Sequence, residues 1–308
     1  MRHFLTVTDL STTEIERIFA ITEDLKTKYA AGLREPLLPG RVMAMLFEKP
    51  SLRTRVSFEA GMINLGGQSL LLGNDTGFGS RESMADFARV LGQYVDMIVV
   101  RTNKHETAVE IAKYSDCSVI NGLTDYAHPC QAMADLYTLK ELVGSLAGHT
   151  LAFVGDANNV SRSLLEGCGL LGMRFVMASP NAYRFEASYL KQIKKLIPSL
   201  DFHVTDDPTE AVRRALAVYT DVWASMGQES EIAKRHRDFA DYQVNAKLMA
   251  EAPNAYFMHC LPAHRGEEVT DEVIDGPQSI VVAEAANRLH VQKGILAWLL
   301  GRQSRTAE

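Results

Sequence analysis

Arginine and hydroxyl side chains gather in residues 48–59, EKPSLRTRVSFE. Ser51, Arg53, Thr54 and Arg55 lie where an apolar, strand-like run gives way to a helix-like one. The first turn of a helix offers unpaired backbone N–H groups and the positive end of the helix dipole, and an arginine fork binds phosphate through two hydrogen bonds. The segment therefore predicts an anion site, a phosphate cradle built without a P-loop.

The same segment also allows a purely structural interpretation. Ser51 can be only a helix N-cap, and Arg55 can pair with Glu59 four residues further on. We favour the structural interpretation for Arg55 and anion binding for Arg53. In either case the helix is expected to bury one apolar stripe, formed by Leu52, Val56, Ala60 and Ile63. It is expected to end at Gly66 and Gly67.

Length and composition limit what such an anion can be. The chain has 308 residues, 46% of them hydrophobic, which favours two domains. A net charge of -6 argues against a nucleic-acid partner or a membrane-surface protein. The N-terminus and the apolar run 294–300 are too short for a signal peptide or a membrane span, so we expect a cytoplasmic protein. The four cysteines show no CxxC spacing, which favours reduced thiols over disulfides or zinc.

Two series of strand-like runs must position these residues. An amphipathic helix is predicted at 11–32, with a capping box from Ser11 to Glu14. Short apolar runs follow at 41–47, 68–73, 96–102 and 118–124, and the pattern restarts with TLAFVGD, RFVMASP, DFHVTDD, LAVYTDVW and AYFMHCLP. This pattern predicts an α/β protein with two doubly wound domains, each a parallel sheet flanked by helices, and an active site in the cleft between them. The expected boundaries are 1–147, 148–283 and a C-terminal helix, 284–308, that packs back on the first domain.

Polar residues follow the predicted strands at their carboxyl ends, where open α/β sheets bind ligands. Any single one of them is as well explained by an ordinary polar turn. Six such positions together favour a functional site: Ser51, Arg101, Asn121, Asp156, Asp221 and His259.

Four motifs, spread in order over most of the chain, are specific when taken jointly. They are SLRTR (51–55), HPCQ (128–131), DVWASMG (221–227) and HCLPAHRGEEVTDEVIDG (259–276). Together they resemble the aspartate/ornithine carbamoyltransferase family, and the last two resemble its ornithine branch. The resemblance implies transfer of a carbamoyl group from carbamoyl phosphate to the δ-amine of L-ornithine, giving citrulline and phosphate in arginine metabolism. It also implies a homotrimer or a multiple of trimers, and neither a metal nor an organic cofactor.

The resemblance assigns one set of residues to carbamoyl phosphate. Ser51, the Leu52 backbone, Arg53 and Thr54 are expected to hold the phosphate, and Arg101, His128 and Thr54 to face the carbonyl oxygen. Fixed donors aimed at developing charge are typically worth ~3 kcal/mol each. The carbamoyl nitrogen is expected to meet Gln131 and the backbone carbonyls near Cys260 and Leu261, and Arg288 is a late basic contact. A histidine before proline is more often a loop residue than a catalyst, and the sequence leaves the protonation of His128 open.

A second set is assigned to ornithine. The α-carboxylate and α-ammonium are expected at Asn159, Asp221, Ser225 and the Met226 backbone, with Cys260 beside the δ-amine. Arg101, His128 and Cys260 are thus the predicted catalytic residues. A free alkyl amine is protonated at pH 7, so activity is expected to rise with pH. Structural interpretations also exist, because Asp221 can be an N-cap and Cys260 a small buried residue.

One loop departs from the family pattern. Residues 73–83, GNDTGFGSRES, stand where a loop of a neighbouring subunit is expected to reach the phosphate, often with a glutamine, and Gly77 occupies that place. Ser80 or Arg81 is a possible replacement donor, and the glycines fit a segment that closes over substrate.

Other functions remain open at this point. A carbamoyltransferase for putrescine or an acylated ornithine shares SLRTR and HPCQ, although it has no need for Asp221 as an ammonium partner. A nucleotide-binding oxidoreductase is disfavoured because GDANNV lacks GxGxxG. A zinc site at His259, Cys260 and His264, or a nucleophilic Cys260, is weakly supported because no further ligand pair completes a familiar spacing. A non-enzymatic relative is a further alternative.

Overall fold

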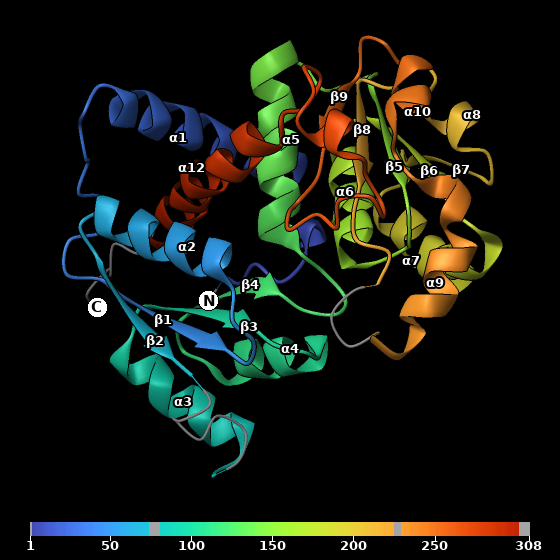
Figure 1. The fold of residues 1–308 in the computed structure, drawn as a ribbon. Helices are drawn as coiled ribbons and strands as arrows, with labels where there is room; N and C mark the ends of the chain where they lie inside the picture. The colour runs from blue at the N-terminus through green and yellow to red at the C-terminus, as the bar shows by residue number, and fades with distance from the viewer. Residues whose placement is uncertain (1, 74–80, 225–228, 302–308) are drawn as a thin grey trace. The chain divides into compact units, whose positions relative to one another are not determined.

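The computed structural model describes residues 2–73, 81–224 and 229–301. The chain forms two compact units, residues 1–137 with 286–308 and residues 138–285. Both contain a parallel β-sheet with helices packed against it (Figure 1). The fold class predicted from the sequence is therefore confirmed, whereas the predicted boundaries after residues 147 and 283 stay a prediction.

The first unit is built on a four-stranded sheet of order β2-β1-β3-β4. Its strands are β1 (Val42–Phe47), β2 (Gln68–Leu72), β3 (Met97–Arg101) and β4 (Ser118–Leu123). Its helices are η1 (Val7–Asp9), α1 (Thr12–Ala30), α2 (Leu52–Asn64), α3 (Met84–Tyr94) and α4 (His105–Tyr114). Two more, α5 (Pro129–Val143) and α12 (Val281–Leu300), have residues in both units.

The second unit is built on a five-stranded sheet of order β7-β6-β5-β8-β9. Its strands are β5 (Thr150–Val154), β6 (Arg174–Ala178), β7 (Asp201–Thr205), β8 (Ala217–Thr220) and β9 (Tyr256–Met258). Its α-helices are α6 (Asn159–Leu170), α7 (Ala187–Leu196), α8 (Pro208–Val212), α9 (Ile232–Asp238), α10 (Ala246–Ala250) and α11 (Asp271–Ile274). Short 3-10 helices are η3 (Asn181–Tyr183), η4 (Glu229–Glu231) and η5 (Ala240–Tyr242).

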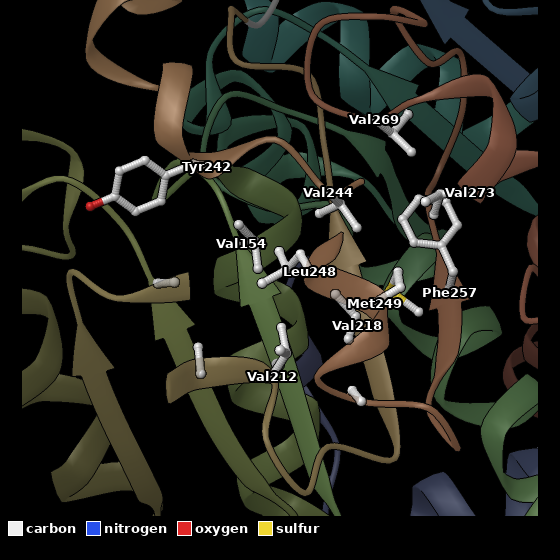
Figure 2. Close-up of a cluster of buried hydrophobic side chains, with 14 of the residues drawn as sticks. Val154, Val212, Val218, Tyr242, Val244, Leu248, Met249, Phe257, Val269 and Val273 are labelled. Atoms are coloured by element: carbon white, nitrogen blue, oxygen red, sulfur yellow. The ribbon is translucent and has the colours of Figure 1, made fainter. Parts of the chain in front are cut away.

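Apolar strand residues make the core of each unit. In the second unit, one cluster joins Val154 and Val218 from the central strands to Leu248, Phe257 and Val269 (Figure 2). Burial of such side chains contributes roughly 1.5–3 kcal/mol each. The core therefore fixes the carboxyl ends of the strands, from which the polar loops emerge.

Most elements predicted from the sequence are confirmed. All nine strand-like runs are strands, and α1 begins with the predicted capping box, in which Ser11 and Glu14 satisfy each other's backbone N–H groups. The C-terminal helix begins three residues earlier than predicted, at Val281. In the first unit, Lys26 of α1 donates a hydrogen bond to Asn287 of α12. No described helix is long and apolar enough to cross a membrane.

The predicted buried stripe of α2 is wrong. Leu52, Val56 and Ile63 are 75%, 49% and 63% exposed, and Ala60 is only partly buried. The side of α2 that is buried carries Thr54, Phe58, Gly61 and Met62. A Cβ on Gly61 would lie 3.4 Å from the Lys293 side chain, an ordinary contact distance, so this side of α2 faces α12. The apolar stripe is consequently left on the surface of the single chain.

Candidate functional site

The N-terminus of α2 carries the predicted phosphate-binding residues. Ser51 is the N-cap, and its hydroxyl accepts a hydrogen bond from the Thr54 N–H at 3.4 Å. The backbone N–H groups of Leu52 and Arg53 open the helix, where no carbonyl of a preceding turn can accept them. Arg55 forms the predicted ion pair with Glu59, at 3.3 Å. The structure thus gives Ser51 and Arg55 structural contacts and leaves the first turn arranged as an anion site would be.

Buried positive charge lies beside this turn. Arg288 of α12 donates a hydrogen bond from Nη2 to the Thr54 hydroxyl at 3.0 Å, and both residues are buried. Arg101 is the last residue of β3 and is also buried. The structure therefore brings three predicted residues, from three different elements, into one half of the site.

His128 belongs to the same cluster. It directly precedes α5 and is buried, and burial followed by the positive charges of Arg288 and Arg101 holds its pKa well below the usual value. The side chain is therefore a neutral imidazole at neutral pH, with one N–H donor and one acceptor nitrogen. This answers the question of its charge that the sequence left open.

Two amides around His128 have different tasks. Gln131 lies on the first turn of α5, and its Nε2 donates to the buried carboxylate of Asp135 at 2.7 Å. Asn121 on β4 donates from Nδ2 to the Leu5 and Ala127 carbonyls at 2.9 and 3.3 Å. Asn121 thus holds the turn that leads to His128, which is a structural role.

The second unit centres on Asp221, which follows β8 and is buried. Its Oδ1 accepts hydrogen bonds from Cys260 Sγ at 3.2 Å and from the Val222 N–H at 2.9 Å. Its Oδ2 accepts from Asn158 Nδ2 at 2.7 Å. Because β8 and β9 are neighbours in the sheet, the segments that follow them, with Asp221 and Cys260, meet at the same edge. The predicted Asp221 and Cys260 are therefore brought together.

The segment after β5 holds one predicted residue and one that was missed. Asn159 is the first residue of α6, whereas the neighbouring Asn158 is the N-cap and also the residue that contacts Asp221. An asparagine before a helix is a capping signal, and that signal could have marked Asn158. Asp156 forms a buried ion pair with Arg235 at 2.6 Å, and burial raises its pKa. Asp156 therefore serves the scaffold.

Four predicted positions lie outside the described residues. Ser225 and Met226 belong to the segment 225–228, and Gly77 belongs, with Ser80, to 74–80. Arg81 is described and lies just before α3.

Leu261 and Cys260 occupy an unusual turn. Leu261 has φ +56°, in the left-handed region that bulky residues rarely adopt, and its peptide bond to Pro262 is cis. Cys260 is the only one of the four cysteines, all described, that is not buried. The turn thus leaves the Cys260 thiol partly accessible.

The zinc interpretation meets an obstacle in this turn. Donor atoms of Asp221, His259 and Cys260 do lie within 4.8 Å of one another. However, His259 Nδ1 accepts the Leu261 N–H at 2.9 Å, and Nε2 lies 3.2 Å from Glu268 Oε1. Both ring nitrogens have partners, so binding of a metal would require breaking one of these bonds.

Comparison with known proteins places these two half-sites in a family. Residues 2–141 match the carbamoyl-P binding domain, and residues 147–299 the Asp/Orn binding domain, of aspartate/ornithine carbamoyltransferase. The ornithine carbamoyltransferase of Carboxydothermus hydrogenoformans is 50% identical over 304 residues, which cover 97% of this chain and 98% of that one. The enzyme of the same name from Bacillus subtilis is 49% identical over 303 residues, 97% of this chain and 94% of that one.

Solved structures agree with the sequence relatives. The ornithine carbamoyltransferase from Pyrococcus furiosus superimposes with a TM-score of 0.94 at 44% identity, covering 98% of this chain and 97% of that one. The Thermus thermophilus enzyme gives 0.87 at 41% identity, covering 97% and 99%. The likeness extends over both units and both sets of motif residues, and this chain belongs to the aspartate/ornithine carbamoyltransferase family.

Proposed function

We propose that the two half-sites serve one reaction, in which the first unit holds carbamoyl phosphate and the second holds L-ornithine. The chain transfers the carbamoyl group to the δ-amine of ornithine, giving L-citrulline and phosphate. The observation that carries this conclusion is the match of nearly the whole chain, at about half identity, to relatives named ornithine carbamoyltransferase.

In the first unit, the first turn of α2 receives the phosphate. The N–H groups of Leu52 and Arg53, the Arg53 guanidinium and the Thr54 hydroxyl supply donors, and the Ser51 hydroxyl, which accepts the Thr54 N–H as the helix cap, donates its own proton to the phosphate. Arg288 fixes the position of the Thr54 hydroxyl by donating a hydrogen bond to it. A dianion at this point is attracted both by the helix N-terminus and by the arginines.

Arg101 and His128 act on the carbonyl oxygen. When the amine attacks, this oxygen gains negative charge, and donors already in place stabilise it. Because His128 is neutral, it contributes one N–H, while Arg101 contributes formal charge. Gln131 faces the carbamoyl NH2 and so distinguishes this donor from an acetyl phosphate.

In the second unit, Asp221 pairs with the α-ammonium of ornithine. Asn158 and Cys260 hold its two carboxylate oxygens in position, and Asn159 is proposed to contact the α-carboxylate together with Ser225 and Met226. Cys260 lies beside the δ-amine. Ammonium and carboxylate groups of a free amino acid are thus each matched, which putrescine cannot achieve because it lacks the carboxylate.

The reaction balances with these groups alone. The δ-ammonium loses a proton, the nitrogen lone pair forms the bond to the carbonyl carbon, and the carbon–oxygen bond to phosphate breaks. Phosphate leaves with the electron pair of that bond and takes up the second proton that the attacking nitrogen gives up, so hydrogen phosphate is released. Activity therefore rises with pH as the neutral amine becomes available.

The assembly proposed for the chain is a homotrimer or a multiple of trimers. Its support in this structure is a set of exposed apolar side chains on α2 and the edge strand β2: Leu52, Val56, Ile63, Leu70 and Leu71 are all exposed in the single chain. Exposed apolar side chains on neighbouring elements are typical of an interface. All four cysteines are free, which fits the proposed cytoplasmic location, a reducing compartment.

A panel of amine acceptors tests the function. Purified protein is incubated with carbamoyl phosphate and, separately, ornithine, N-acetylornithine, putrescine or aspartate, and both phosphate and carbamoylated product are measured. We expect ornithine to exceed every other amine by at least about 100-fold in kcat/KM, because N-acetylornithine leaves Asp221 unmatched, putrescine leaves the carboxylate-binding groups unmatched, and aspartate has no δ-amine. Preference for putrescine or acetylornithine would instead establish a different branch of the family.

A further inference from the structure

The imidazole of His259 is fixed on both sides. It is buried at the end of β9, with Nδ1 2.9 Å from the Leu261 nitrogen and Nε2 3.2 Å from Glu268 Oε1. A backbone N–H can only donate, so Nδ1 must carry a lone pair, and the ring proton lies on Nε2. His259 is therefore the neutral Nε2–H tautomer, which accepts from Leu261 and donates to Glu268.

Glu268 is a buried carboxylate placed for this contact. Its Oε1 also accepts the His264 N–H at 2.6 Å, while its Oε2 has no hydrogen-bond partner among the described residues. Its backbone carbonyl accepts from Val244, and the adjacent Val269 lies in the core cluster (Figure 2). A buried carboxylate with one unsatisfied oxygen costs stability and calls for a functional explanation.

The backbone of His259 is held as well. Its N–H donates to Glu284 Oε2 at 3.1 Å, and the other oxygen of Glu284 accepts from the Tyr219 hydroxyl at 3.2 Å. Two buried carboxylates thus accept hydrogen bonds from one histidine: Glu284 from its backbone N–H and Glu268 from its ring. Such a network leaves the ring a single orientation.

The group that this orientation controls is the turn at Cys260. The hydrogen bond from the Leu261 N–H to His259 Nδ1 closes a short loop around Cys260, and Leu261 keeps the left-handed φ of +56°. A leucine in that region is strained, and the conformation persists only where its surroundings hold it. The ring of His259 supplies that restraint.

We propose that His259 and Glu268 are positioning residues, which hold the Cys260–Leu261 turn in the geometry that presents the thiol to the reacting amine. The inference rests on the proposed function, since the turn matters for catalysis only if the δ-amine lies there. His259 and Glu268 themselves do not touch substrate. Misplacement of a reacting group by about 1 Å costs about 100-fold in rate, so the loss of this restraint is measurable.

A matched pair of variants separates the two ring nitrogens. His259→Asn places an amide oxygen near the position of Nδ1, so it can accept the Leu261 N–H but falls short of Glu268. His259→Gln reaches toward Glu268 but has no acceptor near the position of Nδ1. We expect His259→Asn to keep kcat within about tenfold of the parent and His259→Gln to lose about 100-fold, with KM for carbamoyl phosphate unchanged in both. His264→Ala, which keeps its backbone N–H, is the control and should behave as the parent.

The reactivity of the Cys260 thiol gives a measurement that does not depend on activity. The other three cysteines are buried, and burial raises the pKa of Cys130 to about 12, so Cys260 should react first with 5,5′-dithiobis(2-nitrobenzoate). We expect His259→Gln to change this rate at least about fivefold and His259→Asn to leave it near the parent value, because only the former frees the turn.

The outcomes distinguish the two proposals. If the parent does not carbamoylate ornithine, the proposed function fails, while the thiol rates still report on the turn. If the parent is active and the two variants are equal in kcat and in thiol rate, the positioning role is wrong. Glu268→Gln covers the case in which His259 variants do not fold: it retains an acceptor for the ring N–H and should keep kcat within about tenfold. A folded Glu268→Gln protein with a larger loss would overturn the proposal.

Discussion

The two half-sites contain buried side chains of opposite charge. In the first unit, Arg101 and Arg288 lie close enough to His128 for their charges to lower its pKa. In the second unit, the buried charge of the half-site is the Asp221 carboxylate, which accepts hydrogen bonds from Asn158 and Cys260. The contrast follows the proposed substrates, because positive charge attracts a phosphate dianion and a carboxylate attracts an α-ammonium.

This difference in charge suggests that the first half-site contributes mainly to the affinity for substrate and the second mainly to its orientation. A cluster of cations gains free energy when an anion enters, so the first half-site is expected to bind strongly and to be stabilised by its ligand. In the second half-site, neutral hydrogen-bond donors hold the Asp221 carboxylate in a fixed geometry. Positioning contacts such as those of His259 are accordingly found in the second unit.

The largest expected effect in the first unit comes from Arg53. Arg53→Ala should raise KM for carbamoyl phosphate about 100-fold and leave KM for ornithine within about twofold, because a charge-assisted bidentate contact to phosphate is worth about 2–3 kcal/mol. Initial rates with each substrate varied in turn measure both constants. Arg55→Ala is the matched control, two residues along the same helix, and should change neither constant since Arg55 is exposed and paired with Glu59.

The converse effect is expected in the second unit. Asp221→Asn keeps the shape of the side chain but removes the charge that meets the α-ammonium. KM for ornithine should therefore rise about 100-fold, while KM for carbamoyl phosphate should not change. Equal effects of Arg53→Ala and Asp221→Asn on both substrates would contradict the division of labour between the units.

Much of the scaffold could be predicted because its signals are local. Each strand is an apolar run bounded by turn residues, and Ser11 with Glu14 marks a helix start from two positions three residues apart. The motif residues Asp221 and Cys260 were also found, although they lie 39 positions apart, because the motifs themselves carried the information.

What the sequence could not give depends on tertiary neighbours. Periodicity shows that α2 has an apolar stripe but not which of its faces meets α12, and the face that is buried carries Thr54, Phe58, Gly61 and Met62 instead. The contact of Asn158 with Asp221 requires the sheet order that places β8 next to β5, so it is not visible before the strand order is known. The contact of Glu268 with His259 depends on how the segment after β9 folds back on itself.

His128 sharpens the contrast through the pH dependence of stability. Its pKa in the folded protein is lowered by burial and by two arginines, so the unfolded chain takes up the proton first as the pH falls. Stability is therefore complete above the unfolded pKa of about 6.5 and is lost as the pH falls below it. Urea unfolding at pH 7.5 and 5.5 should show a smaller acid loss for His128→Gln than for the parent.

The control for this measurement is His264→Gln, a change at an exposed histidine, which should reproduce the acid loss of the parent. An identical loss in His128→Gln and the parent would show that the arginine cluster does not penalise protonation of His128, and the charge contrast between the units would weaken accordingly.

The smallest expected effect comes from Lys293 of α12, and it tests whether positive charge buried in the first unit costs stability. It is buried in the first unit, and burial together with the charge of Arg34 lowers its pKa to about 8. The unfolded lysine protonates near pH 10.4, so the penalty develops between about pH 10.4 and 8 as the pH falls and is complete below pH 8. Lys293→Met removes this penalty but also the contact of the ammonium with the Tyr29 ring at 4.6 Å. We expect a net gain of about 1 kcal/mol in the free energy of unfolding at pH 7, which shrinks toward pH 10.

Lys28, in the same unit, has a pKa shifted in the opposite direction to that of Lys293. Its hydrogen bonds to Asp24 and Glu35 raise its pKa, so its contribution is present below the unfolded pKa and is lost as the pH rises through the folded one. Lys28→Met should therefore bring no gain at pH 7, in contrast to Lys293→Met. If urea unfolding instead gave Lys293→Met the same gain at pH 7 and pH 10, the gain would come from packing rather than from charge. The first unit would then no longer be distinguished by the cost of the positive charge that it buries.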